Sequence, residues 1–484
     1  MIIDEYLDYT KTYTEKYGDR CIVLMQVGSF YELYAIKDDT SEAIYTIADI
    51  CNIQISRKNK SIQEVSVSNP LMAGFPLYTI RKFTNILLSH NYTIVMVEQV
   101  TEPPNPQRKV TDILSPGMNI NVTNNKKNNY MMVVYYEFIG ELLVAGIAAI
   151  DLSTGKCLLY EAGSSKSDPE FANDEVFRIL TTYNPCELII LSDKKYDEAK
   201  KGYILRNLNL TNMLVHLKWE TFDFIKCMQK LAYQTAILER AFAKKNMLTI
   251  IESLNIERYE YGRIALCCIL QFAYEHNVDI IKKLDIPEII NDNMYLSVEY
   301  NSAVQLNILG LYPNDRPLLD ILNRCNTSFG SRIFRDRLLK PIFDPDVLNK
   351  RYKEIAYMLQ ENRWQQVNKH LCHILDLERI KRKMMMSKFH PQDWFGFNAS
   401  LENAVAILET FYRYDTAAFK DMVSYYTGHI DIDEASKYNL GDIKGNIFIK
   451  GIYQEVDQYA NDFDEAYQKI VKINDKINKL DRLG

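Results

Sequence analysis

Near the N-terminus, an apolar run leads into the stretch Gln26-Val27-Gly28-Ser29-Phe30-Tyr31-Glu32-Leu33-Tyr34. After the glycine, a large aromatic residue and a carboxylate stand two positions apart, at Phe30 and Glu32. Ser29 and Glu32 also fit the S-x-x-E pattern of a capping box, in which Ser29 begins a helix and Glu32 bonds to its backbone amide. On this interpretation Gly28 ends a strand, and the aromatic residues pack where the helix begins.

The same residues suit a second role, in reading the pairing of a DNA duplex. An apolar side chain that enters between base steps from the minor groove costs about a few kcal/mol of unstacking, least where pairing is already defective. Phe30 has the shape of such a wedge, and the carboxyl group of Glu32 is placed to bond to the displaced base. Because phosphates repel a carboxylate, this role favours a protonated or well-paired Glu32.

Length and charge set limits on any such role. A chain of 484 residues predicts about three or four domains with ample core. Its net charge of −6 means that contact with DNA must come from local basic patches. Two candidates are a basic turn at Arg57, Lys58 and Lys60 and a basic pair at Arg108 and Lys109, although either can also be ordinary solvated surface.

Cysteine and histidine usage predicts free thiols in a reducing compartment and no metal site. The 9 cysteines form no C-x-x-C pair, and the 7 histidines are scattered. No basic segment followed by an apolar stretch opens the chain, and the apolar run from Leu142 to Ile150 is too short to span a bilayer. We therefore expect a soluble, intracellular protein with no membrane partner.

The first ~120 residues alternate strand-like and helical runs, which predicts a compact mixed α/β module. The polar segment from Asn121 to Asn129 is the best candidate for a linker. Beyond it, three apolar runs separated by turn residues predict an antiparallel meander. These runs are Met131 to Tyr136, Leu142 to Ile150 and Cys157 to Tyr160.

Asp151 follows the second run of that meander, where a nuclease of the ribonuclease H type would place a metal-binding carboxylate. Two-metal chemistry needs several converging carboxylates, and no partner motif is evident. We interpret Asp151 as a turn residue.

From about Phe222 the pattern becomes helical, with Leu266, Ile269, Leu270 and Ala273 on one face. Positive charge gathers on two later helical stretches, which we interpret as solvated faces, with phosphate contact as the alternative. These clusters are Arg332, Arg335, Arg337 and Lys340, and Arg379, Lys381, Arg382 and Lys383.

The last segment has a regular heptad pattern, which predicts a coiled coil or a long helix pair. Such a seam needs a partner, either another chain or a helix absent from this sequence. The heptad seam consists of Val456, Tyr459, Phe463, Ala466, Ile470, Ile473, Ile477 and Leu480.

Several separated stretches resemble, in the same order, the MutS family of DNA repair proteins. The stretch from Gln26 to Tyr34 is similar to the mismatch-reading loop of that family. Further similar segments are Met72 to Pro76, Val97 to Gln99, Thr111 to Gly117, Ala149 to Gly155, Leu319 to Arg332, Leu338 to Pro341 and Asp376 to Ile380.

The resemblance implies a multidomain fold of α/β and all-α parts. Residues 1–120 would be a mixed α/β mismatch-recognition domain, 128–240 a ribonuclease-H-like connector, 241–440 a helical core and lever, and 441–484 the start of the lever and clamp helices. No G-x-x-x-x-G-K-[S/T] phosphate loop occurs, so ATP and magnesium are expected only with an ATPase domain that is missing here, and the chain itself is expected not to be an enzyme. The full-length protein would be a dimer.

The resemblance also assigns roles to the residues of the opening stretch. Phe30 would be the wedge, Glu32 would contact the base, Tyr31 would brace the loop from the core, and Gly28 would shape it. The expected partner is double-stranded DNA with mismatches. The alternative is a non-catalytic scaffold that binds other repair or replication proteins, with Phe30 packed at a helix start. A third, a nuclease that uses Asp151, predicts metal-dependent cleavage.

Overall fold

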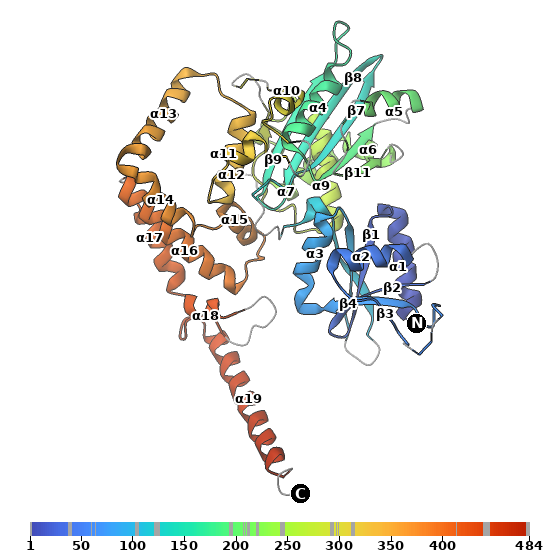
Figure 1. Cartoon of the computed structure of the whole chain (residues 1–484), viewed down its shortest axis with the longest axis vertical. Coiled ribbons are helices and arrows are strands. Elements are labelled where there is room, and N and C mark those ends of the chain that lie inside the picture. The colour runs from blue at the N-terminus through green and yellow to red at the C-terminus, as the bar shows by residue number, and fades with distance from the viewer. Residues whose placement is uncertain are drawn as a thin grey trace. The chain divides into compact units, whose positions relative to one another are not determined.

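The computed structural model divides into two compact units, Met1–Leu348 with Lys381–Met386, and Asn349–Ile380 with Ser387–Gly484 (Figure 1). None of the helices in the described part of the chain is long and apolar enough to cross a membrane. The described residues are 2–36, 41–59, 61–62, 64–101, 106–120, 126–192, 197–206, 208, 210, 213–218, 222–242, 247–290, 295–296, 298, 300–310, 315–412, 414–438 and 446–480.

The N-terminal part of the first unit is a six-stranded sheet with helices on both faces, so the predicted mixed α/β module is confirmed (Figure 1). The strand order is β3-β4-β2-β1-β5-β6. Because successive side chains of a strand point to opposite faces, the strands place apolar residues on both faces of this sheet. Helices α2 and α3 cover one face, and α1 covers the other. The elements are α1 (Ile2–Tyr17), β1 (Cys21–Val27), β2 (Phe30–Ala35), α2 (Ser41–Cys51), β3 (Ser56–Arg57), β4 (Leu71–Pro76), α3 (Ile80–Ser89), β5 (Thr93–Gln99) and β6 (Arg108–Leu114).

A second six-stranded sheet follows, in the order β11-β10-β7-β8-β9-β12. The three strands β7, β8 and β9 pair antiparallel, which confirms the predicted meander, and β10 and β11 extend the sheet in parallel. Helices α4 and α5 cover one face, and α6, α7 and α9 cover the other. The elements are β7 (Met131–Ile139), β8 (Leu142–Asp151), β9 (Lys156–Gly163), α4 (Phe171–Tyr183), β10 (Glu187–Ser192), α5 (Glu198–Leu205), β11 (Leu214–Lys218), α6 (Phe222–Met228), α7 (Leu231–Ala241), α8 (Ile250–Ser253), α9 (Glu260–His276) and β12 (Glu288–Ile289).

The linker predicted at 121–129 falls partly outside the described residues, which resume at Lys126. Helix α9 buries the predicted apolar face, and it is enclosed on its other sides as well, because Cys267 and Cys268 are also buried. The predicted domain boundaries at 120, 128, 240 and 440 stay predictions.

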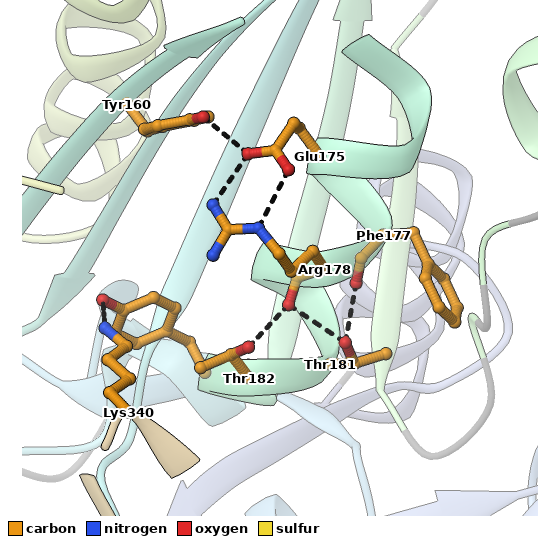
Figure 2. A network of polar contacts seen from close by, with 8 residues as sticks. Tyr160, Glu175, Phe177, Arg178, Thr181, Thr182 and Lys340 are labelled. Atoms are coloured by element: carbon orange, nitrogen blue, oxygen red, sulfur yellow. Dashed lines mark hydrogen bonds and ion pairs between the residues drawn. The ribbon is translucent and has the colours of Figure 1, made fainter. Parts of the chain in front are cut away.

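A polar network fastens α4 to β9 (Figure 2). The carboxylate of Glu175 accepts a hydrogen bond from the Tyr160 hydroxyl at 2.5 Å and two from the Arg178 guanidinium at 3.0 and 2.7 Å. Burial alone would raise the pKa of Glu175, but the bonds from Arg178 and Tyr160 outweigh it and lower that pKa below its usual value. One helical turn on, Thr181 and Thr182 donate to the Arg178 carbonyl.

The interpretation of the two basic clusters as solvated faces is wrong for three of their members. The side chains of Arg332, Arg379 and Arg382 are buried. Arg382 donates to the carbonyl oxygens of Ile280 at 2.5 Å and Lys282 at 2.6 Å. A guanidinium carries five N–H donors, so one side chain can satisfy several carbonyls at the end of a turn. Lys340, from the first cluster, lies 4.1 Å from the ring centre of Tyr183 and donates to its hydroxyl (Figure 2).

The described residues beyond β12 are mainly helical, as predicted. Within the second unit, α16 packs against α14, α17 and α18, where the Tyr426 hydroxyl donates to the side chain of Asn398 at 2.7 Å. The elements are α10 (Tyr300–Gln305), α11 (Leu318–Leu322), α12 (Ser328–Leu339), α13 (Pro345–Leu359), α14 (Arg363–Leu371), α15 (Leu377–Met385), α16 (Pro391–Ile407), α17 (Ala417–Thr427), α18 (Ile432–Ser436) and α19 (Gln454–Leu480).

Candidate nucleic-acid interface

The opening stretch forms a β-hairpin. Strands β1 and β2 pair antiparallel with Val27 opposite Phe30, so Gly28 and Ser29 are the turn. Gly28 has a φ of +59°, a region that other residues enter only with strain, and this is the position where a type II′ turn takes glycine. The capping-box interpretation is therefore wrong: Ser29 lies in a hairpin turn and begins no helix.

Phe30 and Glu32 lie on the same face of the sheet, because side chains two residues apart on a strand point the same way. Phe30 is next to the turn, and 45% of its surface is exposed. Glu32 is half-buried and accepts a hydrogen bond from the hydroxyl of Tyr34, the next residue on that face. The Glu32 carboxylate thus has a hydrogen-bond donor within its own strand, and its role toward a base stays a prediction.

Tyr31 points to the opposite face and is only 3% exposed. Its ring lies 6.2 Å from that of Phe75, and its hydroxyl donates to the Glu98 carboxylate at 2.6 Å. Burial, and next the bond to Glu98, hold the pKa of the Tyr31 hydroxyl well above its usual value, so it stays a donor. Tyr31 anchors β2 while its neighbour Phe30 remains accessible.

A second layer of residues holds the turn. Gln26 accepts from the Gln99 amide N–H at 3.0 Å, and its carbonyl accepts from the Arg108 guanidinium at 3.1 Å. Arg108 also pairs with Glu5 at 3.6 Å, and its side chain is only 6% exposed. Contact between Arg108 and a phosphate would require it to leave these partners, so at this position the structure favours bracing of the hairpin.

Sequence reasoning assigned no role to four residues that support the site: Gln26, Tyr34, Glu98 and Gln99. Glu98 and Gln99 could have been found from the sequence, since they belong to one of the segments that resemble the MutS family. No local signal pairs them with the hairpin, because Glu98 is 67 residues from Tyr31.

The two predicted basic spots do not form one patch. Arg57 and Lys58 are at the end of β3 and Lys109 is on β6, at opposite edges of the sheet. Five strand spacings separate those edges, about 24 Å at the usual distance between strands. Lys58 and Lys109 are exposed, whereas Arg57 is half-buried and donates to the Ile62 carbonyl at 3.1 Å. Lys60 lies outside the described residues.

Asp151 is a fully buried turn residue, as predicted. One carboxylate oxygen accepts from the Ser153 amide at 2.9 Å and its hydroxyl at 2.6 Å, and the other accepts from the Asn129 amide at 2.9 Å. The described residues contain no group of three or more histidine, cysteine or acidic side chains that could hold a metal.

These features define a multidomain protein whose N-terminal α/β module presents an exposed aromatic ring on a braced hairpin. Comparison with known proteins gives the family: residues 6–123 match the model of MutS domain I, and residues 301–483 match that of MutS domain III. The chain belongs to the MutS family.

The similar curated proteins are named as mismatch repair proteins. A putative DNA mismatch repair protein of Acanthamoeba polyphaga mimivirus is 26% identical, over 98% of this chain and 47% of its own length. The DNA mismatch repair protein MutS of Caldanaerobacter subterraneus subsp. tengcongensis is 24% identical, over 92% of this chain and 49% of its own. A mitochondrial DNA mismatch repair protein mutS homologue from Sarcophyton glaucum is 26% identical, over 73% of this chain and 40% of its own length. The chain thus spans about half the length of the relatives it matches.

Proposed function

We propose that this chain binds mismatched or kinked duplex DNA in mismatch repair and reads the mispair with Phe30. The observation that carries the proposal is the 45% exposed ring of Phe30 beside a braced hairpin turn. The names of the relatives support a role in mismatch repair.

In this mechanism the Phe30 ring enters the minor groove and unstacks one base step. The cost is about a few kcal/mol, and it is lowest where pairing is already defective. Glu32, on the same face, bonds to the displaced base, and the Tyr34 hydroxyl holds its carboxylate in place beforehand. A rigid strand pair is suited to this task, because the protein loses little conformational freedom when it binds.

Exposed Lys58 and Lys109 are the proposed phosphate contacts, together with Arg57 and Lys60. The place of Lys58 and Lys109 at opposite sheet edges supports two separate contacts with the DNA backbone, on either side of the strands that carry the hairpin. Phosphate contacts position the protein without reading sequence, which fits recognition of any mispair.

The direct test compares binding to a duplex with one G·T mismatch and to the matched duplex. Phe30→Ala should bring the two affinities together, because without the wedge no base is displaced for Glu32 to contact. Tyr45→Ala is the matched control, since Tyr45 is 51% exposed on α2 of the same module and should leave the preference intact. An unchanged preference in Phe30→Ala would reject the wedge.

The remaining expectations also stand as proposals. The chain itself is non-enzymatic, residues 128–240 form a ribonuclease-H-like connector, and the full-length protein is a dimer that uses ATP and magnesium through its ATPase domain. The antiparallel β7–β9 and parallel β10–β11 support the connector assignment. The competing scaffold function has support in the exposed apolar residues of α19, although the exposure of Phe30 does not favour it.

A further inference from the structure

Tyr78 is the most exposed large apolar side chain in the described part of the N-terminal sheet and its helices, at 77%. It lies in the short 3-10 helix η1 (Leu77–Thr79), which connects β4 to α3. A phenol ring with this exposure contributes little to the core of the sheet. Its hydroxyl can donate a hydrogen bond, so the side chain is suited to contact a ligand that offers acceptors.

The position of Tyr78 is fixed relative to the hairpin that carries Phe30. Strand β4 pairs with β2 so that Pro76 lies opposite Phe30, and the Leu77 amide donates to the Ser29 carbonyl at 3.0 Å. Cross-strand partners are about 5 Å apart and consecutive Cα atoms about 3.8 Å, so the Cα atoms of Phe30 and Tyr78 are at most about 13 Å apart. Because each strand of a duplex carries a phosphate about every 3.4 Å along the axis, a duplex that meets Phe30 passes Tyr78 within about four phosphates.

The sequence on either side of Tyr78 has a positive charge, although the chain as a whole is acidic. No aspartate or glutamate occurs from Val65 to Val97, in a chain with 63 acidic residues and a net charge of −6. Lys82 is exposed in the first turn of α3, four residues after Tyr78. Residues four apart on a helix are neighbours on its surface, so Tyr78 and Lys82 form one surface. The helix dipole disfavours a cation in this turn, so Lys82 does not serve the stability of α3.

We propose that Tyr78 and Lys82 form a further contact with the DNA backbone, beside the Phe30 wedge. The Tyr78 hydroxyl donates to a phosphate oxygen, and the Lys82 ammonium pairs with a neighbouring phosphate of the same strand. A donor and a cation without nearby acidic residues in the sequence fit a polyanion. The inference rests on the proposed function, because it takes the duplex that meets Phe30 as the ligand.

This contact has a task that the lysines at the sheet edges do not perform. Phosphate contacts fix the register of a protein on its duplex. Lys58 and Lys109 lie at the two edges of the sheet, whereas Tyr78 follows the strand that pairs directly with the strand of Phe30. Tyr78 and Lys82 therefore hold the backbone close to the base step that the ring enters.

Fluorescence anisotropy with the matched duplex and the G·T duplex tests the contact. Tyr78→Phe keeps the ring and removes only the hydroxyl, so it should weaken binding to both duplexes by the same factor of about three to ten, at an unchanged salt slope. Lys82→Ala removes one cation, so it should flatten the slope of log affinity against log salt by about 1 on both duplexes.

The matched controls are Tyr45→Phe and Lys16→Ala, which should bind as the parent chain does. Tyr45 is 51% exposed on α2. Lys16 is exposed in the last turn of α1, before the start of β1, whereas the hairpin turn follows the end of that strand. Tyr78 and Lys82 are exposed as well, so circular dichroism should show an unchanged fold in all four variants.

Two results would overturn the proposal. One is a parent chain that prefers the mismatch while Tyr78→Phe and Lys82→Ala bind both duplexes as tightly as the parent does. The other is loss of the mismatch preference in Tyr78→Phe, which would make Tyr78 a reader of the mispair instead of a backbone contact. Equal binding of the parent chain to both duplexes would reject the wedge but not this contact, because the two variants would still weaken that binding.

Discussion

Phe30 and Tyr31 are adjacent residues with opposite tasks, because successive side chains of a strand point to opposite faces. Tyr31→Phe removes the hydroxyl that donates to Glu98 and leaves the carboxylate without that donor, so it should lower the free energy of unfolding by about 1–2 kcal/mol. Urea denaturation measures this loss. Phe30→Ala is the matched comparison: it should change stability far less, and a larger loss for Phe30→Ala would show that its ring packs rather than projects.

Glu32 is the second residue whose role can be separated from folding. Glu32→Gln keeps a group that can bond to a base but removes a negative charge near the phosphates. We expect tighter binding to matched and mismatched duplexes alike, and a smaller ratio between the two. Titration of both duplexes at fixed salt measures this ratio. Weaker binding to every duplex would mean that the carboxylate makes an essential contact that an amide cannot replace.

For individual residues, the sequence could indicate which side chains matter but not which partners they contact. Ser29 and Glu32 satisfy a helix-capping pattern, yet the chain pairs as a hairpin, because the strand partner β4 and the buried ring of Phe75 lie more than 40 residues away. Arg382 looked like surface charge for the same reason, since its carbonyl partners are 102 and 100 residues distant. Local patterns carry no information about such contacts.

At the level of elements, the start of β10 is tied to the turn that follows β6. One oxygen of the Glu187 carboxylate accepts from the Ser115 hydroxyl at 2.5 Å and the Gly117 amide at 3.0 Å, and the other pairs with His216 at 2.8 Å. A Cβ at position 117 would lie 2.9 Å from that carboxylate, so the glycine makes the approach possible. These bonds connect the N-terminal sheet to the second sheet.

This connection should respond to acid. Burial alone would raise the pKa of Glu187, but the bonds from His216, Ser115 and Gly117 outweigh it and lower that pKa below 4.5. The stabilisation is therefore present above pH 4.5 and is lost as pH falls through the lowered pKa. Glu187→Gln should cost about 2–3 kcal/mol at neutral pH, and less under acid conditions.

Urea unfolding at neutral pH and below pH 4.5 gives this comparison, with Glu198→Gln as the control because the Glu198 side chain is 91% exposed. A constant difference between Glu187→Gln and the parent chain at all pH values would mean that the carboxylate contributes no charge-dependent stability.

The elements themselves were largely predictable, but their order in space was not. The apolar runs and turn residues predicted the meander of β7, β8 and β9 because each of its contacts joins neighbouring strands. The two basic spots were expected only as local patches. Their separation follows from a strand order in which β3 and β6 are opposite edges, a consequence of long-range pairing.

For the whole molecule, a net charge of −6 makes its electrostatic field unfavourable to DNA, so the binding that we propose would depend on few phosphate contacts and on the wedge. The two contributions should separate in their salt dependence. Lys58→Ala/Lys109→Ala removes about two phosphate contacts, which should flatten the slope of log affinity against log salt by about 2 and weaken matched and mismatched duplexes equally. Phe30→Ala should leave that slope unchanged while it removes the preference for the mismatch, because unstacking releases no counterions. Fluorescence anisotropy over a salt series measures both quantities, and an unaltered slope in the double lysine variant would place the phosphate contacts elsewhere on the molecule.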